Sequence, residues 1–173
     1  MYVPTRFAAP DTAALHRLID THALGALVRA GAQRLDADHL PFERVPPSPA
    51  APHGLLRAHV ARANPLWRED GARVLVLFRG AHAYESPLSY DLRKLEGRAV
   101  PTWTYEVAHV HGSLRTVDDR EWLLAHMAAT TRRYEGADGW KIDDAPPDYI
   151  EKLVRAVVGI EIAIEKIEGK FKR

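Results

Sequence analysis

The chain has 173 residues, of which 46% are apolar and 27% are charged, and its 24 Lys and Arg nearly balance its 23 Asp and Glu. This composition is typical of a folded globular protein, and the length suits a single domain over residues 1–173. A formal net charge of +1 argues against a protein that holds DNA through the charge of one copy. The absence of cysteine excludes disulfides, thiolate metal sites and a cysteine nucleophile.

The N-terminal residues carry no basic stretch followed by an apolar run, so no signal peptide is expected. No apolar run reaches the length that a membrane-spanning helix needs. We therefore expect a soluble, cytoplasmic protein without a membrane partner.

The first half of the chain predicts one helix followed by strands. Asp11 is a suitable N-cap for the helical stripe of apolar residues after it. Apolar patterning predicts strands in these segments: 26–29, 35–43, 54–60 and 74–78. Pro41 has no amide hydrogen, so the second strand should lie at a sheet edge or a bulge. The proline-rich segment 46–52 predicts a stiff surface loop.

The run 74–78 is continuously apolar, which predicts an interior strand that is buried on both faces. Residues 81–85 are expected to form the next strand and to pair with it. The polar segment 88–99 is expected to be a loop or a short helix.

The second half predicts a long strand at 103–114 and then two helices. Asp118 and Glu121 match a capping box that opens the first helix, and a proline pair before Asp148 opens the second. Gly159 is expected to stop that second helix. Residues 160–165 alternate between isoleucine and other residues, which predicts a half-buried strand.

These elements amount to six or seven strands and three helices. The strands cluster in mid-chain without βαβ alternation. This order predicts a mainly β fold with peripheral helices (α+β), built as an antiparallel barrel.

The segment 56–65 gathers donor side chains at a strand end that runs into a proline-led turn. Guanidinium groups of Arg57 and Arg62, the polar side chains of His59 and Asn64, and free amides at the turn all match phosphate oxygens. We interpret the segment as a phosphate cradle. A pair of surface arginines beside an ordinary turn would produce the same pattern.

Two further segments suit a flat ligand. His39, followed by Leu40, is placed to line a pocket wall and to offer a hydrogen bond, although on these residues alone a buried structural histidine is the more common arrangement. Tyrosines and hydroxyls around Ser86, and again around Trp103, would stack on a heteroaromatic ring and meet its polar edge. Hydrophobic core interrupted by turns is the alternative for both.

His109 and His111 share one face of the predicted strand, but no further metal ligand lies near them in sequence, so no metal site is predicted. The basic C-terminal residues 166–173 are typical of a solvated tail. Alternatively, a lysine from this segment reaches a phosphate that is bound on a partner subunit. Glycine-rich nucleotide-binding motifs, the GxSxG motif and a tight helix-turn-helix are absent.

Taken in order, short segments of the chain resemble the PaiB-type FMN-binding negative transcriptional regulators. The matching pieces are 1–4 with Phe7, 39–42, 59–65, 78–80 with Tyr84, 86–87 with Tyr90, 101–105, 110–112 and 167–170. The resemblance implies the FMN-binding split-barrel fold and a homodimer with two FMN sites at the subunit interface. DNA enters as a partner through the resemblance alone.

The resemblance also implies roles for particular residues. Arg57, His59, Arg62 and Asn64 would contact the phosphate or ribityl chain of FMN, and Lys170 would come from the other subunit. The residues placed near the isoalloxazine ring are His39, Thr102 and Trp103. The same segments add four cofactor-binding candidates: Leu40, Val60, Ser86 and Tyr90.

Three departures from the family pattern leave alternatives open. A carboxylate enters at Glu85 and the family's tryptophan is lost nearby; Thr104 replaces an asparagine; and the sequence stops at Arg173 where the family tail continues. FMN binding would then be weak or absent, which gives a cofactor-free binding protein. A flavin-dependent oxidoreductase of pyridoxamine-oxidase-like architecture is the other alternative, with His109, His111 and Glu85 as residues to test, although no acid–base pair identifies catalytic residues.

Overall fold

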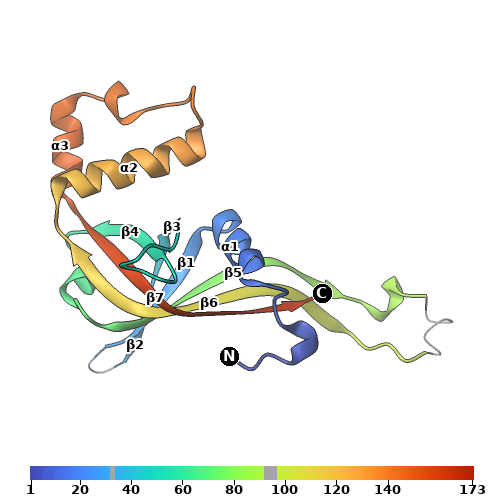
Figure 1. Cartoon of the computed structure of the whole chain (residues 1–173). Helices are drawn as coiled ribbons and strands as arrows, with labels where there is room; N and C mark the ends of the chain where they lie inside the picture. The colour runs from blue at the N-terminus through green and yellow to red at the C-terminus, as the bar shows by residue number, and fades with distance from the viewer. Residues whose placement is uncertain (32–33, 92–96) are drawn as a thin grey trace.

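The computed structural model of the chain describes residues 1–31, 34–91 and 97–173. Within these ranges one antiparallel sheet of seven strands has the order β2-β1-β5-β6-β7-β4-β3 (Figure 1). The strands are β1 Leu24–Ala30, β2 Leu35–Pro41, β3 Glu43–Val45, β4 Leu55–Ala61, β5 Arg73–Glu85, β6 Thr102–Val117 and β7 Val157–Lys172. The predicted antiparallel, mainly β architecture is confirmed.

Three α-helices and four short 3-10 helices accompany the sheet in the described part of the chain. They are α1 Thr12–Thr21, α2 Arg120–Glu135, α3 Pro147–Arg155, η1 Thr5–Phe7, η2 Pro65–Arg68, η3 Pro87–Ser89 and η4 Ile142–Asp144. Asp11 caps α1 as predicted, because its carboxylate accepts a hydrogen bond from the Ala14 amide at 2.6 Å. None of the described helices has the length and apolar character that crossing a membrane would need.

Several predicted boundaries were wrong. Residues 81–85 continue β5 instead of forming a new strand, and the register to β6 shifts between Arg79 and His82. The N-cap of α2 is Asp119, whose carboxylate accepts from the Trp122 amide at 2.7 Å. Asp118 is bound to Arg62 instead. The segment 88–99 contains the end of η3, and 92–96 lie outside the described residues.

Gly159 does not stop α3, which ends at Arg155; it lies inside β7. A Cβ there would overlap the ring of Trp122, so a glycine lets α2 pack directly on the strand. The expected half-burial of 160–165 is confirmed at Ala163 and Glu165, which are exposed, and was wrong only at Glu161. Glu161 is only 5% exposed, because α2 covers the outer face of the sheet at this end.

The hydrophobic core lies on the inner face of the curled sheet and is closed by α1. Strand residues such as Val76, Phe78 and Val110 pack there against Leu18 and Ile19 of the helix. The predicted burial of 74–78 on both faces was wrong, because the outward side chains of this run are only half-buried. The outer face of β5 therefore lacks a cover within the described chain.

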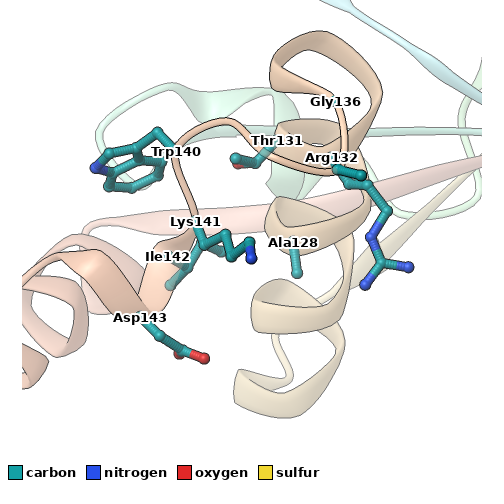
Figure 2. Close-up of a pocket in the computed structure, with 9 residues that line it drawn as sticks. Ala128, Thr131, Arg132, Gly136, Trp140, Lys141, Ile142 and Asp143 are labelled. Atoms are coloured by element: carbon teal, nitrogen blue, oxygen red, sulfur yellow. The ribbon is translucent and has the colours of Figure 1, made fainter.

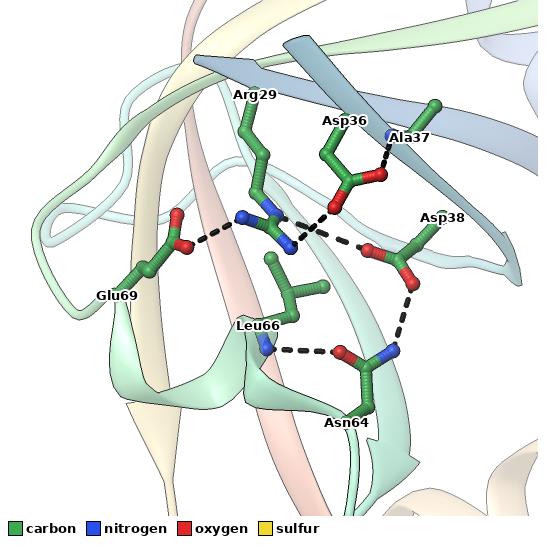
Figure 3. A network of polar contacts seen from close by, with 7 residues as sticks. All are labelled: Arg29, Asp36, Ala37, Asp38, Asn64, Leu66 and Glu69. Atoms are coloured by element: carbon green, nitrogen blue, oxygen red, sulfur yellow. Dashed lines mark hydrogen bonds and ion pairs between the residues drawn. The ribbon is translucent and has the colours of Figure 1, made fainter. Parts of the chain in front are cut away.

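The edge strands β2 and β3 follow each other with only Phe42 between them, and polar side chains lie between β2 and the segment that follows β4. Arg29 of β1 is 7% exposed and lies among three carboxylates (Figure 3). Its distances are 2.5 Å to Glu69, 3.3 Å to Asp36 and 3.9 Å to Asp38. Asn64, at the end of β4, donates to Asp38 at 2.7 Å. Pro41 ends β2, so its predicted edge position is confirmed.

β5 and β6 continue beyond the barrel as a two-stranded arm, while α2 and α3 form a lobe at the opposite end (Figure 1). The N-terminal segment covers the edge of β7 that β4 leaves free. Ala8 bridges to Lys170, and the Ala9 amide donates to the Gly169 carbonyl at 3.3 Å. The barrel and the base of the arm are thereby braced on both edges of β7.

We expect Arg29→Met to lower the free energy of unfolding by about 2 kcal/mol, because it leaves three facing carboxylates without their buried cation. Urea unfolding at neutral pH measures this change. The control is Arg73→Met, which removes an 83% exposed partner of Glu165 and should cost less than about 0.5 kcal/mol. Equal losses in the two variants would contradict the closing role of Arg29.

Candidate functional site

The outer surface of β1, β5, β6 and the C-terminal half of β7 is not covered by a helix in the described chain. Alternate residues of antiparallel strands share a face, so the strand register gives its members. We call this surface the open sheet face; it consists of His39, Ala26, Val28, Leu75, Leu77, Arg79, Val107, His109, His111, Lys166, Glu168 and Lys170. Most of these side chains are only half-buried.

One row of side chains crosses the open sheet face from edge to interior. His39 of β2 faces Ala26 of β1, which faces Leu77 of β5; next come His109 of β6 and Glu168 of β7. The row therefore joins the predicted ligand residue His39 to two polar residues on distant strands. Sequence spacing alone does not show this neighbourhood.

The next row toward the arm carries positive charge. Arg79 and Lys170 lie on either side of Val107 in the register. Arg79 is exposed and has no ion-pair or hydrogen-bond partner among the described residues. The Lys170 ammonium lies 5.5 to 5.9 Å from the ring centroids of Tyr105, Tyr2 and Phe7, so aromatic faces and not a carboxylate hold it. Both cations are available to an anion.

Aromatic side chains extend the open sheet face onto the arm. Trp103 is 54% exposed and meets Tyr84, 56% exposed, edge to face with the ring centroids 6.0 Å apart. These large exposed rings offer stacking surface to a flat ligand. Thr102, at the start of β6, accepts a hydrogen bond from Lys172.

Ser86 and Tyr90 lie farther out on the arm. Ser86 caps η3 by accepting from the Leu88 amide at 3.2 Å, which gives its hydroxyl a local structural role. Tyr90 is 41% exposed. The structure thus brings Trp103, Lys170 and His39 onto one face, with Thr102, Ser86 and Tyr90 beyond its end.

His109 and His111 of the open sheet face are partly buried and lie near the ionised carboxylate of Glu168. Burial lowers the pKa of His109, and the nearby amino terminus adds to the effect. Glu168 has its pKa lowered to about 2 by its hydrogen bonds with Lys166 and the amino terminus, so it stays ionised. His111 Nε2 is buried, and it lies 3.6 Å from Glu168, beyond hydrogen-bond distance.

His111 lines a hollow of about 270 Å³ together with Val28 and Leu75, and its buried Nε2 lies on the side of Glu168. A buried polar atom without a partner is rare unless something else binds there. Across the described residues no three His, Asp or Glu side chains are arranged to hold a metal ion. The donor set of the open sheet face, with free cations, exposed rings and an unpaired imidazole nitrogen, fits a flat heteroaromatic ring that carries an anion.

The predicted phosphate cradle is occupied by the protein's own carboxylates. Arg57 donates to Glu161 at 2.8 Å. Arg62 binds both oxygens of Asp118, at 2.8 and 2.6 Å, and also donates to two backbone carbonyls. The Arg62 hydrogen bond lowers the pKa of Asp118, so this carboxylate stays ionised. The two guanidinium groups thus bind different carboxylates, and a phosphate bound between them would have to displace both Glu161 and Asp118.

His59 lies beneath α2, next to Arg57. Its ring is 5.5 Å from that of His126, which hydrogen bonds to Glu43 at 2.9 Å and stacks on Trp122. Burial lowers the pKa of His59, and the neighbouring His126 lowers it further. Its Nδ1 is buried without a hydrogen-bond partner. His59 is therefore a neutral, packed ring at neutral pH.

The remaining predicted residues have structural positions. Val60 is 3% exposed and packs in the core, and Leu40 packs partly against the core. Asn64 caps η2 and binds Asp38. Sequence reasoning missed Arg79 and Leu77 on the open sheet face. The alternation at 103, 105, 107, 109 and 111 could have indicated that these side chains of β6 share one face. The residues of β5 that lie beside them can be identified only from the pairing of the two strands.

Comparison with known proteins agrees with this site chemistry. Residues 1–166 match the family model described as "Putative FMN-binding domain". The chain belongs to this FMN-binding family. Within it, Protease synthase and sporulation protein PAI 2 of Bacillus subtilis is 27% identical over 176 residues, which cover 99% of this chain and 81% of that protein. The predicted resemblance to PaiB-type proteins is confirmed.

A second relative and a solved structure extend the comparison. A protein of Emericella nidulans, AN0679, is 31% identical over 211 residues, covering 99% of this chain and 83% of its own length. Among solved structures, the flavocytochrome Anf3 from Azotobacter vinelandii has a TM-score of 0.74 at 9% identity and covers 99% of this chain and 73% of that chain. The structural likeness shows the fold, which is the predicted split barrel.

We expect the protein to lose stability as the pH falls from about 7.5 to about 5.5. An unfolded histidine takes up a proton near pH 6.5, whereas burial lowers the pKa of His59 in the folded chain. Protonation therefore favours the unfolded state below about pH 6.5. His59→Gln should reduce this loss, measured by urea unfolding across the range. His53→Gln, at an exposed loop position, should leave the pH dependence unchanged; an equal reduction there would contradict the assignment.

Proposed function

We propose that two copies of this chain bind FMN between them, with the flavin against the open sheet face. The observation that carries the proposal is the joint placement of unpaired cations, exposed aromatic rings and the half-buried His109 and His111 on one surface. The family match supports FMN as the ligand. When bound, FMN supplies redox chemistry, and the protein positions and tunes it.

A second copy is part of the proposal because one copy offers a surface and not an enclosed site. Ligand pockets normally bury most of a ligand's surface, whereas the open sheet face is exposed on one side. The arm exposes Leu88 by 84% and Val100 by 75%, in addition to Trp103 and Tyr84. Covering this apolar surface with a partner would stabilise the assembly and enclose the flavin.

For the phosphate we propose Arg79 and Lys170 as the principal contacts. Neither is bound to a carboxylate, so neither has to break an ion pair before it meets the phosphate. Arg57 and Arg62 would have to leave Glu161 and Asp118 first. Glu85, which the sequence suggests as a source of repulsion, lies six residues along β5 from Arg79, or about 20 Å at the usual rise of a strand.

For the ring, His39 and Trp103 remain the proposed contacts, Trp103 from one copy and His39 with His111 from the other, because Trp103 and His111 lie eight residues apart on β6, about 26 Å at the usual rise of a strand. Trp103 would stack on the ring system, and the imidazole nitrogen atoms would meet polar atoms at its edge.

We propose a regulatory role of the PaiB type for the flavin-bound dimer. The similarity to PAI 2 supports this role. DNA recognition and a cytoplasmic location are part of the same proposal. Among the described residues of the open sheet face, we identify no pair of side chains arranged as a general acid and a general base. Glu168 stays ionised there and pairs with Lys166.

We expect Arg79→Gln combined with Lys170→Gln to weaken FMN binding by about tenfold or more, because both charge-assisted contacts to the phosphate are lost. Quenching of flavin fluorescence measures the affinity. Riboflavin, which lacks the phosphate, should bind the variant as it binds the wild type. The matched control, Lys152→Gln with Arg155→Gln, removes two exposed charges on α3 and should change neither affinity. If instead Arg57→Gln with Arg62→Gln alone removes the preference for FMN over riboflavin, the phosphate lies at β4.

We expect the wild-type protein in solution to have twice the chain mass of 19.4 kDa. Leu77→Glu places a charge at the centre of the proposed interface and should give monomers that no longer bind FMN. Light scattering after size exclusion measures the mass. Leu153→Glu, at a 42% exposed position on α3, should remain dimeric. Monomeric wild-type protein that still binds FMN would refute the shared site.

A further inference from the structure

A second cavity lies in the lobe, away from the open sheet face. It has a volume of about 410 Å³ and is enclosed between the C-terminal half of α2 and the segment that leads from it to η4 (Figure 2). Its lining consists of Ala128, Thr131, Arg132, Gly136, Ala137, Trp140, Lys141, Ile142 and Asp143. This volume is within the usual range for small-molecule sites.

Local structure holds this cavity open. Gly136 ends α2 with a φ of +79°, which reverses the chain direction. Gly139 then packs so tightly on Glu135 that a Cβ would overlap the Glu135 carbonyl. The Lys141 amide donates to Asp144 at 2.8 Å and fixes the start of η4. Small side chains on α2, Ala128 and Thr131, leave the space between helix and loop unfilled.

Two cations in the lining have no carboxylate. Arg132 and Lys141 form no ion pair or side-chain hydrogen bond with any residue in the described chain. Other arginines near the lobe do: Arg120 lies 2.7 Å and Arg155 lies 3.8 Å from Glu151, and Arg133 lies 3.8 Å from Asp20. The free positive charges of this lining thus come from both α2 and the loop.

The rest of the lining suits a flat apolar body. Trp140, 47% exposed, and Ile142 come from the loop, and Ala128 comes from the helix. Figure 2 shows Lys141 extending from the loop toward Ala128, with Arg132 on the same helix. Asp143, the one acidic residue of the lining, would accept a hydrogen bond from a hydroxyl.

We propose that this cavity binds a small aromatic anion, a single flat ring that carries a carboxylate or phosphate group. Arg132 and Lys141 bind the anionic oxygens, and Trp140 and Ile142 contact the ring. None of these residues belongs to the open sheet face, so the site is independent of the flavin.

The test uses calorimetric titration of the full-length protein with three probes: 4-hydroxybenzoate, phenyl phosphate and inorganic phosphate. At least one aromatic probe should bind saturably with a Kd below about 1 mM. Arg132→Gln with Lys141→Gln should weaken it by about tenfold or more. Lys152→Gln, which removes an exposed charge on α3, should change the Kd less than about twofold. Saturation with FMN should leave the affinity unchanged.

Three outcomes would overturn the proposal: no saturable binding of either aromatic probe up to about 10 mM, equal binding by the double variant, or inorganic phosphate that binds as tightly as phenyl phosphate. Circular dichroism checks that the double variant is folded. A second readout uses the wild type alone: the indole N–H resonance of Trp140, assigned with Trp140→Phe, should shift on addition of the bound probe. An unshifted resonance would place the probe elsewhere and overturn the assignment.

Discussion

The antiparallel ladder between β6 and β7 is the element on which the other features depend. Each strand has 16 residues, and they pair from Tyr105 with Lys172 to Val117 with Gly159. Alternation along such a pair commits every second side chain to the core and every other one to the outside. A register shift between His111 and Gly112 reverses the phase in β7, so that Ile164 faces the core whereas Lys166 and Glu168 face outward. The outer surface of this strand pair has one half that a helix covers and one half that no described helix covers. α2 packs on it at Gly159, and the other half remains the open sheet face.

Closure of the barrel uses charge where backbone pairing ends. The chain itself passes from one sheet edge to the other, because β2 ends at Pro41 and β3 begins at Glu43, and no backbone ladder of the described chain joins β2 to β4 across the closure. Arg29 and its three carboxylates connect β1, β2 and the segment after η2 instead. Because Arg29 is buried, the cost of desolvating it is offset only when its acidic partners are in place, so the network defines how the two edges meet.

The partners of the arginines and lysines separate structural charges from available ones. Arg29, Arg57 and Arg62 are each held by carboxylates, and they fix the barrel closure and the packing of α2 and β4. Arg79 and Lys170 on the open sheet face lack such partners, as do Arg132 and Lys141 in the lobe. A near-neutral sequence therefore contains two separate places where an anion meets free positive charge.

The sequence by itself determined the elements and the fold class. Apolar periodicity located the strands, Asp11 marked the start of α1, and Pro41 placed β2 at an edge, because these signals act within a few residues. The ordered motifs also gave the family. Local signals failed where distant residues compete: Asp118 has the residue type of a cap, yet it pairs with Arg62, and Gly159 lies in a strand because Trp122 needs its space.

Only the tertiary structure decided which charged residues are paired with carboxylates and which are not. Arg57 and Arg62 have the spacing of a phosphate cradle, but Glu161 and Asp118, far along the chain, neutralise them. Arg79 stands outside the predicted site residues and becomes available because the register sets it beside Val107 and Lys170. The physical reason is that ion pairing depends on distance in space, which the sheet register sets and which the order of residues along one segment does not contain.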